Sequence, residues 1–151
     1  MRITTWGEYA LICSVHLAHR YGTGPVNGRE LAQAERLPAD YVEQILLRLR
    51  RAGIVTSMRG SHGGYELARP PELVSVREVL TAAEHATFDL HCVSHPVDAG
   101  RCADTGSCSI RPVWLLLQSK IDETLESVKL ADLMPVEREV RERVGLPVLY
   151  A

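Results

Sequence analysis

The chain has 151 residues, of which 46% are hydrophobic and 24% are charged, an ordinary composition for a globular protein with its own core. The net charge of −2 hides an asymmetry, because residues 1–70 carry nine arginines against six acidic residues (net +3), whereas residues 71–151 are net −5. No apolar run reaches membrane-spanning length and the start does not resemble a secretion signal, so we expect a cytoplasmic protein with no membrane partner. The basic first half permits nucleic-acid binding.

Three helices are predicted in the first half. The first begins with the segment Thr5–Glu8, which has the form of a capping box, and continues at helical spacing to a glycine-rich break at residues 21–25. A short second helix is predicted from about Gly28 to Glu35, with Asn27 as its N-cap. After a Leu-Pro break, the apolar pattern predicts a third helix from Asp40 to Ala52.

A β-hairpin is predicted next, because two β-prone segments at residues 54–58 and 65–68 flank a glycine-rich tip. Three helices followed by a hairpin are typical of a winged helix-turn-helix, which we place at residues 1–70. The predicted fold class is therefore mainly α, with a two-stranded β-wing and, as described next, a long dimerisation helix.

The second half begins with another capping box at Ser75–Glu78, which opens a fourth helix through about Ala83. Residues 85–109 lose periodicity and would form an ordered loop only if something held it. A long amphipathic helix follows; it suits either a partner helix in a homodimer or the core of one chain. Its apolar stripe consists of Ile110, Val113, Leu117, Ile121, Leu125 and Val128. We assign residues 71–134 to the loop and dimerisation helix, and 135–151 to a tail or short helix.

Candidate DNA contacts lie on the outward face of the third helix and at the wing tip. Gln44 could pair with adenine, Glu43 could accept from a cytosine amino group, and an arginine could clamp phosphate. Arg59 suits the minor groove or a phosphate. Charges on an amphipathic helix are often only solvated, so the order of helices and wing carries the interpretation. The full candidate set is Asp40, Tyr41, Glu43, Gln44, Arg48, Arg51, Arg59 and His62.

The cysteines indicate a metal site. Cys92, Cys102 and Cys108 lie within seventeen residues, and their soft thiolates suit an iron-sulfur cluster of the 2Fe-2S or 4Fe-4S type. Cys13 lies among apolar neighbours in the first helix and is expected to be a buried small residue. Three thiolates leave one coordination position on iron without a cysteine. The candidates for it are Glu8, His91 and His95.

Two other readings of the cysteines remain open. Three cysteines and a histidine could hold structural zinc, although the usual close spacing of paired ligands is missing. A metal-free thiol switch is also compatible with the pattern. Enzyme activity is not expected, because the sequence contains no nucleophile elbow, phosphate loop or zinc-deaminase motif.

Several segments resemble the Rrf-type family of iron-sulfur winged-helix transcription regulators, which includes IscR, NsrR and RirA. The similar segments are Met1–Thr4, Tyr9-Ala10, Tyr41–Leu46, Leu49–Val55, Arg59-Gly60, Gly63–Tyr65 and Leu130–Leu133. The resemblance implies a dimer with crossed long helices whose recognition helices enter successive major grooves of an inverted-repeat operator. It also places Asp40, Glu43, Gln44 and Arg59 at DNA-reading positions.

The resemblance also bears on the ligands. Cys92, Cys102 and Cys108 match the three cluster thiolates of the family. IscR-like members have a histidine ligand three residues after the last cysteine, where this chain has Arg111, which cannot be deprotonated to bind a metal. NsrR-like members have an acid at the position of Glu8, supplied by the other subunit. On this comparison Glu8 is the preferred fourth ligand, in a site shared by two chains.

The function implied is that of a DNA-binding repressor that senses redox state, nitric oxide, or iron and cluster supply. We expect an oxygen ligand from the partner's first helix to be exchangeable, so that its loss would release that helix and shift the adjoining DNA-reading elements.

Overall fold

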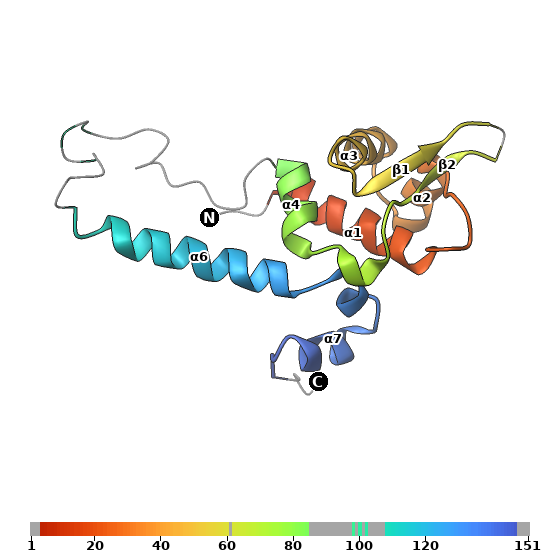
Figure 1. Ribbon diagram of the computed structural model, residues 1–151. Coiled ribbons are helices and arrows are strands. Elements are labelled where there is room, and N and C mark those ends of the chain that lie inside the picture. The colour runs from red at the N-terminus through yellow and green to blue at the C-terminus, as the bar shows by residue number, and fades with distance from the viewer. Residues whose placement is uncertain are drawn as a thin grey trace.

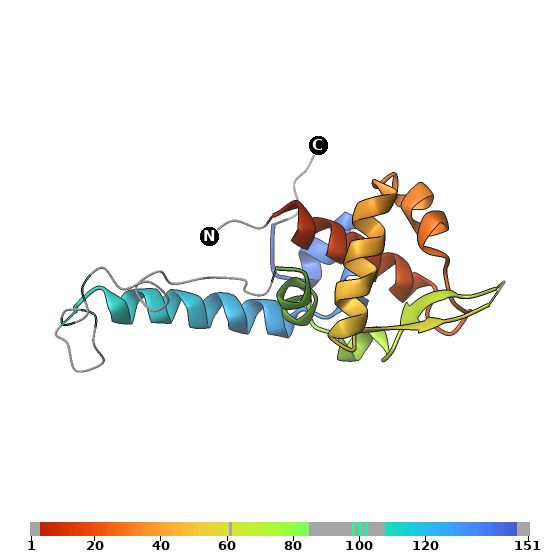
Figure 2. The same cartoon turned by 90° about the horizontal axis from the view of Figure 1, so that it is seen from above.

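The computed structural model describes residues 4–60, 62–84, 98, 100, 102 and 108–147. A head built mainly from residues 4–84 carries one long helix, α6, which extends away from it as an arm (Figures 1 and 2). The predicted mainly helical fold with a two-stranded wing is confirmed. In chain order the elements are α1 (Thr5–His19), α2 (Gly28–Glu35), α3 (Ala39–Arg51), β1 (Val55–Met58), β2 (Gly64–Leu67), η1 (Pro71–Leu73), α4 (Val76–Glu84), α6 (Arg111–Ser127), η2 (Leu130–Leu133) and α7 (Glu137–Arg143).

The head has one core, formed where α1, α3 and α4 pack together. Complete burial of one leucine or isoleucine side chain stabilises the fold by about 1.5–3 kcal/mol. Leu130 of η2 is fully buried in the same core, so the chain returns to the head after α6. The three-part division into residues 1–70, 71–134 and 135–151 stays a prediction. The largest fully buried side chains are Leu17, Leu31, Ile45, Leu46, Leu49, Ile54 and Leu130.

Two helix starts agree with the sequence. Asn27 caps α2, since its Oδ1 accepts a hydrogen bond from the Arg29 N–H at 2.9 Å. At the start of α4, the Ser75 N–H donates to Glu78 Oε2 at 2.8 Å, and the Glu78 N–H donates to Ser75 Oγ at 3.1 Å. This reciprocal pair is the predicted capping box.

The predicted cap of α1 is wrong. The N-cap is Thr4, whose Oγ1 accepts from the Trp6 N–H at 3.2 Å. The carboxylate at this helix end comes from Glu84 at the end of α4, whose Oε1 accepts from the Gly7 N–H at 3.0 Å. Glu8 is left exposed on the first turn. A distant acid has replaced the local one, so Glu8 is not used as a cap.

The wing is an antiparallel pair in which Val55 lies opposite Leu67 and Met58 opposite Gly64. Behind it, Val26 and Tyr65 exchange two backbone hydrogen bonds of 2.8 Å. Gly64 permits this approach, because a Cβ at that position would lie 2.4 Å from the Val26 carbonyl oxygen. The wing is thereby fixed to the segment that precedes α2.

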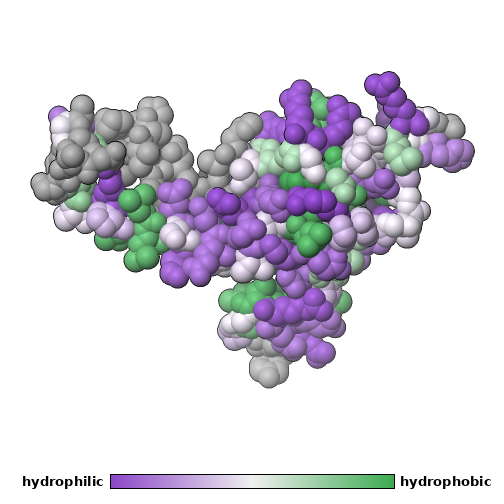
Figure 3. All heavy atoms as spheres, in the orientation of Figure 1, coloured by the Kyte–Doolittle hydropathy of each residue, from purple (hydrophilic) through white to green (hydrophobic). Residues whose placement is uncertain are grey.

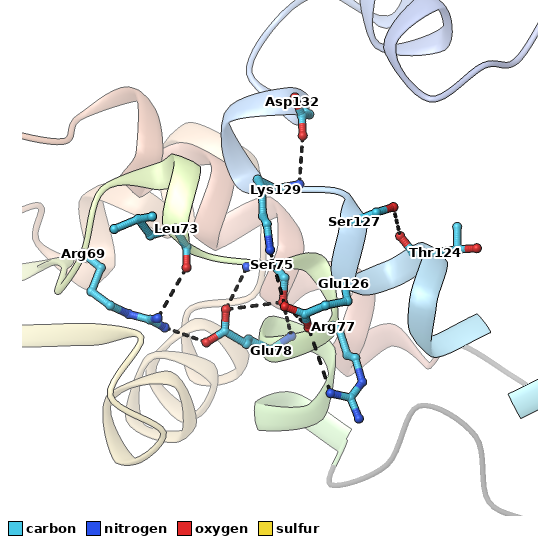
Figure 4. Close-up of polar contacts among 10 residues, drawn as sticks. All are labelled: Arg69, Leu73, Ser75, Arg77, Glu78, Thr124, Glu126, Ser127, Lys129 and Asp132. Atoms are coloured by element: carbon cyan, nitrogen blue, oxygen red, sulfur yellow. Dashed lines mark hydrogen bonds and ion pairs between the residues drawn. The ribbon is translucent and has the colours of Figure 1, made fainter. Parts of the chain in front are cut away.

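The arm α6 is fastened to the head at its C-terminal end. The Val76 N–H donates to Val128 O, and the Leu130 N–H donates to Val74 O, both at 2.9 Å. Side chains reinforce this base, because Ser75 Oγ donates to Glu126 Oε2 at 3.1 Å beside the Ser75–Glu78 capping box (Figure 4). No residue of α6 itself is buried.

The short C-terminal helix predicted near Glu137 to Val144 is present as α7. It is held to η2, since Arg143 Nη1 donates to Ala131 O at 3.4 Å and lies 3.7 Å from Asp132 Oδ1. Among the described residues, no helix is both long enough and apolar enough to cross a bilayer. The cytoplasmic location stays a prediction.

Candidate functional site

The outward face of α3 is a narrow strip between two occupied flanks. Val42, Ile45, Leu46 and Leu49 are buried on the opposite side, so residues spaced three and four apart on the other side point away from the head. On that side, Asp40, Gln44 and Arg51 are exposed and Leu47 is half-buried. We call these four residues the α3 strip.

One flank of α3 faces the wing. Glu43 Oε2 accepts a hydrogen bond from the Tyr65 hydroxyl at 3.4 Å, and Arg50 Nη1 donates to Ser57 Oγ at 3.2 Å. Burial raises the pKa of Tyr65, and the nearby carboxylate of Glu43 raises it further. Tyr65 therefore remains a neutral hydrogen-bond donor to Glu43. The side-chain contacts hold α3 and the wing together as one surface.

The other flank of α3 faces α1 and α4. The ring of Tyr41 lies 4.9 Å from that of Trp6 and makes an edge contact with Tyr9 at 6.0 Å. Arg48 lies over Trp6, with its Cζ 4.1 Å from the ring centroid, and its Nη1 donates to Ala83 O. Tyr41 and Arg48 were both predicted to contact DNA. Each instead makes contacts within the head, and a contact with DNA stays a prediction for both.

The wing tip presents Arg59 and His62, both exposed. Gly60, between them in the chain, has a φ of +124°, a conformation that L side chains rarely adopt. The turn is closed by a hydrogen bond from the Gly63 N–H to Gly60 O at 3.0 Å. The two candidate DNA contacts at the tip therefore lie at a tight turn at the far end of the wing (Figures 1 and 2).

The cysteine end of the arm is described only in part. The side chains of Cys102 and Cys108 are half-buried, while Cys92, His91 and His95 lie outside the described residues. The Cys102 N–H donates to Asp98 O at 2.9 Å, and Arg111 Nη2 donates to Cys102 O. Arg111, which stands where a histidine ligand would be expected, thus binds the backbone of the cysteine segment. In the described part of the chain no three potential ligands gather at one point.

Glu8 lies far from these cysteines within one chain. It sits on α1 in the head, whereas the start of α6 lies at the opposite end of the molecule in both ribbon views (Figures 1 and 2). A helix of 17 residues is roughly 25 Å long at 1.5 Å per residue. Within one chain, the arm therefore separates Glu8 from Cys108.

The arm carries an apolar surface that is exposed in the described part of the chain. Val113 is 59% exposed, Leu116 60% and Leu117 43%. The space-filling view shows a hydrophobic patch over the N-terminal part of α6, while its other end is hydrophilic (Figure 3). Exposed apolar patches of this kind mark interaction surfaces. Val113 and Leu117 belong to the predicted dimerisation stripe and Leu116 widens it. The later stripe residues Ile121, Leu125 and Val128 are half-buried.

Cys13 is fully buried in α1, as predicted. Burial raises the pKa of its thiol to about 12, with a further contribution from the charge of Glu35. The thiolate is the form that reacts and binds metals, so Cys13 is chemically inert at neutral pH.

The junction of Thr4, Gly7 and Glu84 was not predicted from the sequence. Glu84 lies 77 positions from Gly7 and 80 from Thr4, yet its Oε1 accepts from both the backbone and the hydroxyl of Thr4 at 2.9 Å as well as from Gly7. The one available signal was a glycine inside an apolar helical pattern, which often marks a close approach of another chain segment.

Known proteins resemble this chain along most of its length. IscR of Cereibacter sphaeroides is 30% identical over 152 residues, which cover 99% of this chain and 96% of the relative. CymR of Bacillus subtilis is 30% identical over 133 residues, 88% of this chain and 89% of the relative. The structure of that CymR, described as the global cysteine regulator, matches with a TM-score of 0.71 and 28% identity over 89% of this chain and 96% of its own. The structure of T. potens IscR matches with a TM-score of 0.68 and 31% identity over 89% and 86%.

The model of the Rrf2 family, described as an iron-dependent transcriptional regulator, matches residues 3–135. The resemblance noted from the sequence is therefore confirmed, and these relatives are regulators rather than enzymes, as expected. Regulators of this family bind DNA and are generally dimeric. The chain belongs to the Rrf2 family of winged-helix transcriptional regulators.

Proposed function

We propose that the chain is a homodimeric repressor that senses redox state, nitric oxide or iron supply through an iron-sulfur cluster. Cys92, Cys102 and Cys108 of one chain and the partner subunit's Glu8 would hold the cluster. The observation that carries the proposal is the position of two half-buried thiols at the end of an arm whose exposed apolar face calls for a second chain.

The residues present suit such a cluster. Thiolates are the ligands that iron-sulfur clusters use most, and another side chain completes the set where a fourth cysteine is missing; here that side chain would be the partner subunit's Glu8. Glu8 is exposed and does not cap its own helix, so its carboxylate is available. When bound, the cluster would supply a centre that responds chemically to oxidants, nitric oxide and iron limitation. Arg111 would orient the segment through Cys102 O rather than bind metal.

DNA binding is proposed for the α3 strip and the wing tip. Gln44 lies in the middle of the strip, where its amide can pair with an adenine edge, and Glu43 beside it can accept from cytosine. Arg51 at the end of the strip and Arg59 at the wing suit phosphate or a narrow minor groove. In a dimer the two copies of this surface would read the halves of an inverted repeat.

Anaerobic purification followed by absorbance spectroscopy and by iron, sulfide and zinc analysis tests the cluster. We expect a coloured protein whose visible absorbance is lost in Cys92→Ser, Cys102→Ser and Cys108→Ser and altered in Glu8→Ala. Glu30→Ala, at an exposed acid on α2, is the matched control and leaves the spectrum unchanged. A colourless protein with one zinc per chain would overturn the proposal.

A metal-free thiol switch is the second candidate, favoured by the half-buried cysteines Cys102 and Cys108 and by the similarity to a regulator described as a cysteine regulator. Chelation separates the two candidates. If exhaustive removal of iron leaves DNA binding still dependent on thiol oxidation, the thiol switch replaces the cluster.

A further inference from the structure

Arg48 joins three helices of the head at one point. It lies on the flank of α3 that borders α1 and α4, where its guanidinium covers the Trp6 ring at 4.1 Å and donates to Ala83 O. Ala83 belongs to the last turn of α4 and is fully buried. A single side chain of the recognition helix is therefore held both by the first turn of α1 and by the end of α4.

The same two helix ends are also joined directly. Glu84, the residue after Ala83, caps α1 through three hydrogen bonds of 2.9 to 3.0 Å to the backbone and hydroxyl of Thr4 and the backbone of Gly7. α4 is the last element before the cysteine segment, and the first turn of α1 carries Glu8. The two chain segments that lead to the proposed ligands thus meet beside Arg48.

On the other side of the contact lies the DNA-reading surface. Trp6 touches both Tyr41 and Arg48, which are seven residues apart and therefore share one flank of α3. Gln44 lies between them in the helix, on the adjoining α3 strip. A displacement of the first turn of α1 or of the end of α4 would consequently act on the flank of α3 next to Gln44.

We propose that Arg48 is a positioning residue that couples the cysteine site to the recognition helix, an inference that rests on the proposed function. A planar guanidinium can stack on an indole and donate an in-plane hydrogen bond at the same time, which the compact ammonium of lysine cannot do. Arg48 therefore transmits the positions of α1 and α4 to α3, and Lys at this position keeps the charge but loses the coupling.

The coupling is measured as the ratio between the DNA dissociation constants of the metal-free and the cluster-loaded dimer. The dissociation constants of cluster-loaded and metal-free dimer are determined for one duplex, obtained by in vitro selection from a random pool with the wild-type protein. We expect the two forms of the wild type to differ by about fivefold or more. In Arg48→Lys the ratio falls to within about twofold, while the cluster absorbance and the melting temperature of each form stay close to those of the wild type.

Arg50→Lys is the matched control. Arg50 lies on the opposite flank of the same helix and bonds to Ser57 of the wing, so its replacement leaves the ratio unchanged. Trp6→Phe removes the indole from the same junction and is expected to reduce the ratio like Arg48→Lys, which keeps the proposal testable if one variant is unstable.

The outcomes distinguish the two proposals. Equal weakening of both forms in Arg48→Lys, with the wild-type ratio retained, assigns Arg48 to DNA contact or to general stability and overturns the coupling alone. A wild type that assembles no cluster, or whose two forms bind the duplex equally, overturns the proposed function and the coupling with it.

Discussion

The carboxylate of Glu84 lies directly against the backbone of Gly7, whose N–H donates to Oε1 at 3.0 Å. A Cβ on residue 7 would lie 2.3 Å from that oxygen and 2.9 Å from Leu80 Cδ2. Glu84 cannot withdraw without losing its bonds to Thr4, and Leu80 is buried. Glycine at position 7 is therefore what allows α1 and α4 to be joined.

Gly7→Ala is accordingly expected to destabilise the head. Overpacking of this kind costs about 1–3 kcal/mol, more than the gain of up to about 1 kcal/mol from replacing glycine in a helix. Urea unfolding of the metal-free protein measures the difference. The control is Gly28→Ala, where the added Cβ would displace the end of the exposed Glu43 side chain and would meet Leu46 Cδ1 at 3.4 Å, an ordinary contact distance, so the change should stay within about 0.5 kcal/mol. Equal stability of the two variants would contradict this account.

The Ser75–Glu78 capping box predicts a pH dependence. Burial acts to raise the pKa of Glu78, but the hydrogen bond from Arg69, the bonds from Ser75 and the charge of Arg69 outweigh it and lower the pKa below its ordinary value. A carboxyl with a lowered pKa in the folded state stabilises the protein above its unfolded pKa, and this contribution is lost as the pH falls through the folded pKa.

We therefore expect Glu78→Gln to be less stable than the wild type at neutral pH, with a difference that shrinks as the pH falls below about 4.5. Melting temperatures between pH 7 and pH 3 provide the measurement. Glu139→Gln, at an exposed position on α7, should show no comparable difference. A gap between Glu78→Gln and wild type that widens with acid would have the wrong sign.

The apolar face of α6 predicts that one charge there disrupts the dimer. Leu117→Glu would place a carboxylate in the contact between two arms, where an unpaired charge is costly. We expect the dimer dissociation constant to rise at least about 30-fold, which corresponds to 2 kcal/mol. Sedimentation equilibrium measures it, with the exposed Lys120→Gln of the same helix as the control. A dimer that tolerates Leu117→Glu would show that the subunits meet elsewhere.

The burial of Cys13 predicts selective alkylation. With a pKa of about 12 and no access to solvent, its thiol should react with iodoacetamide at pH 7.5 at least about a thousandfold more slowly than an ordinary exposed thiol. Peptide mass spectrometry of reduced, metal-free protein should find Cys102 and Cys108 alkylated first. Unfolding in urea should make all cysteines react alike. Early labelling of Cys13 would show that the core opens.

Much of the fold could be predicted because its signals are local. The Asn27 cap, the Ser75–Glu78 box and the apolar periodicity of α3 each depend on residues within one or two turns. The cap of α1 could not be predicted, because its acid comes from Glu84, about 80 residues away. The local pattern of Thr5 and Glu8 predicted a capping box, but the tertiary contact with Glu84 caps the helix instead.

The candidate site was predictable to a similar extent. Periodicity separates the outward side of α3 from its buried side, but it does not tell which outward residues meet another helix. Arg48 and Tyr41 lie at the border of the two sides, where α1 and α4 decide their contacts. The proposed relation of Glu8 to the cysteines would span two chains, and no spacing within one sequence contains it.

α6 forms a rigid arm that is attached to the head through one short junction. We call this junction, between residues 74–76 and 128–130, the elbow. Two backbone hydrogen bonds join residues 128–130, directly after α6, to residues 74–76 of the head, while the exposed apolar face of α6 lies towards its far end (Figure 3). A rotation of about 5° at the elbow would carry the tip of a roughly 25 Å arm through about 2 Å. In the proposed dimer the distance between the two reading heads, and with it the tolerated spacing of operator half-sites, is therefore a mechanical property of these few residues.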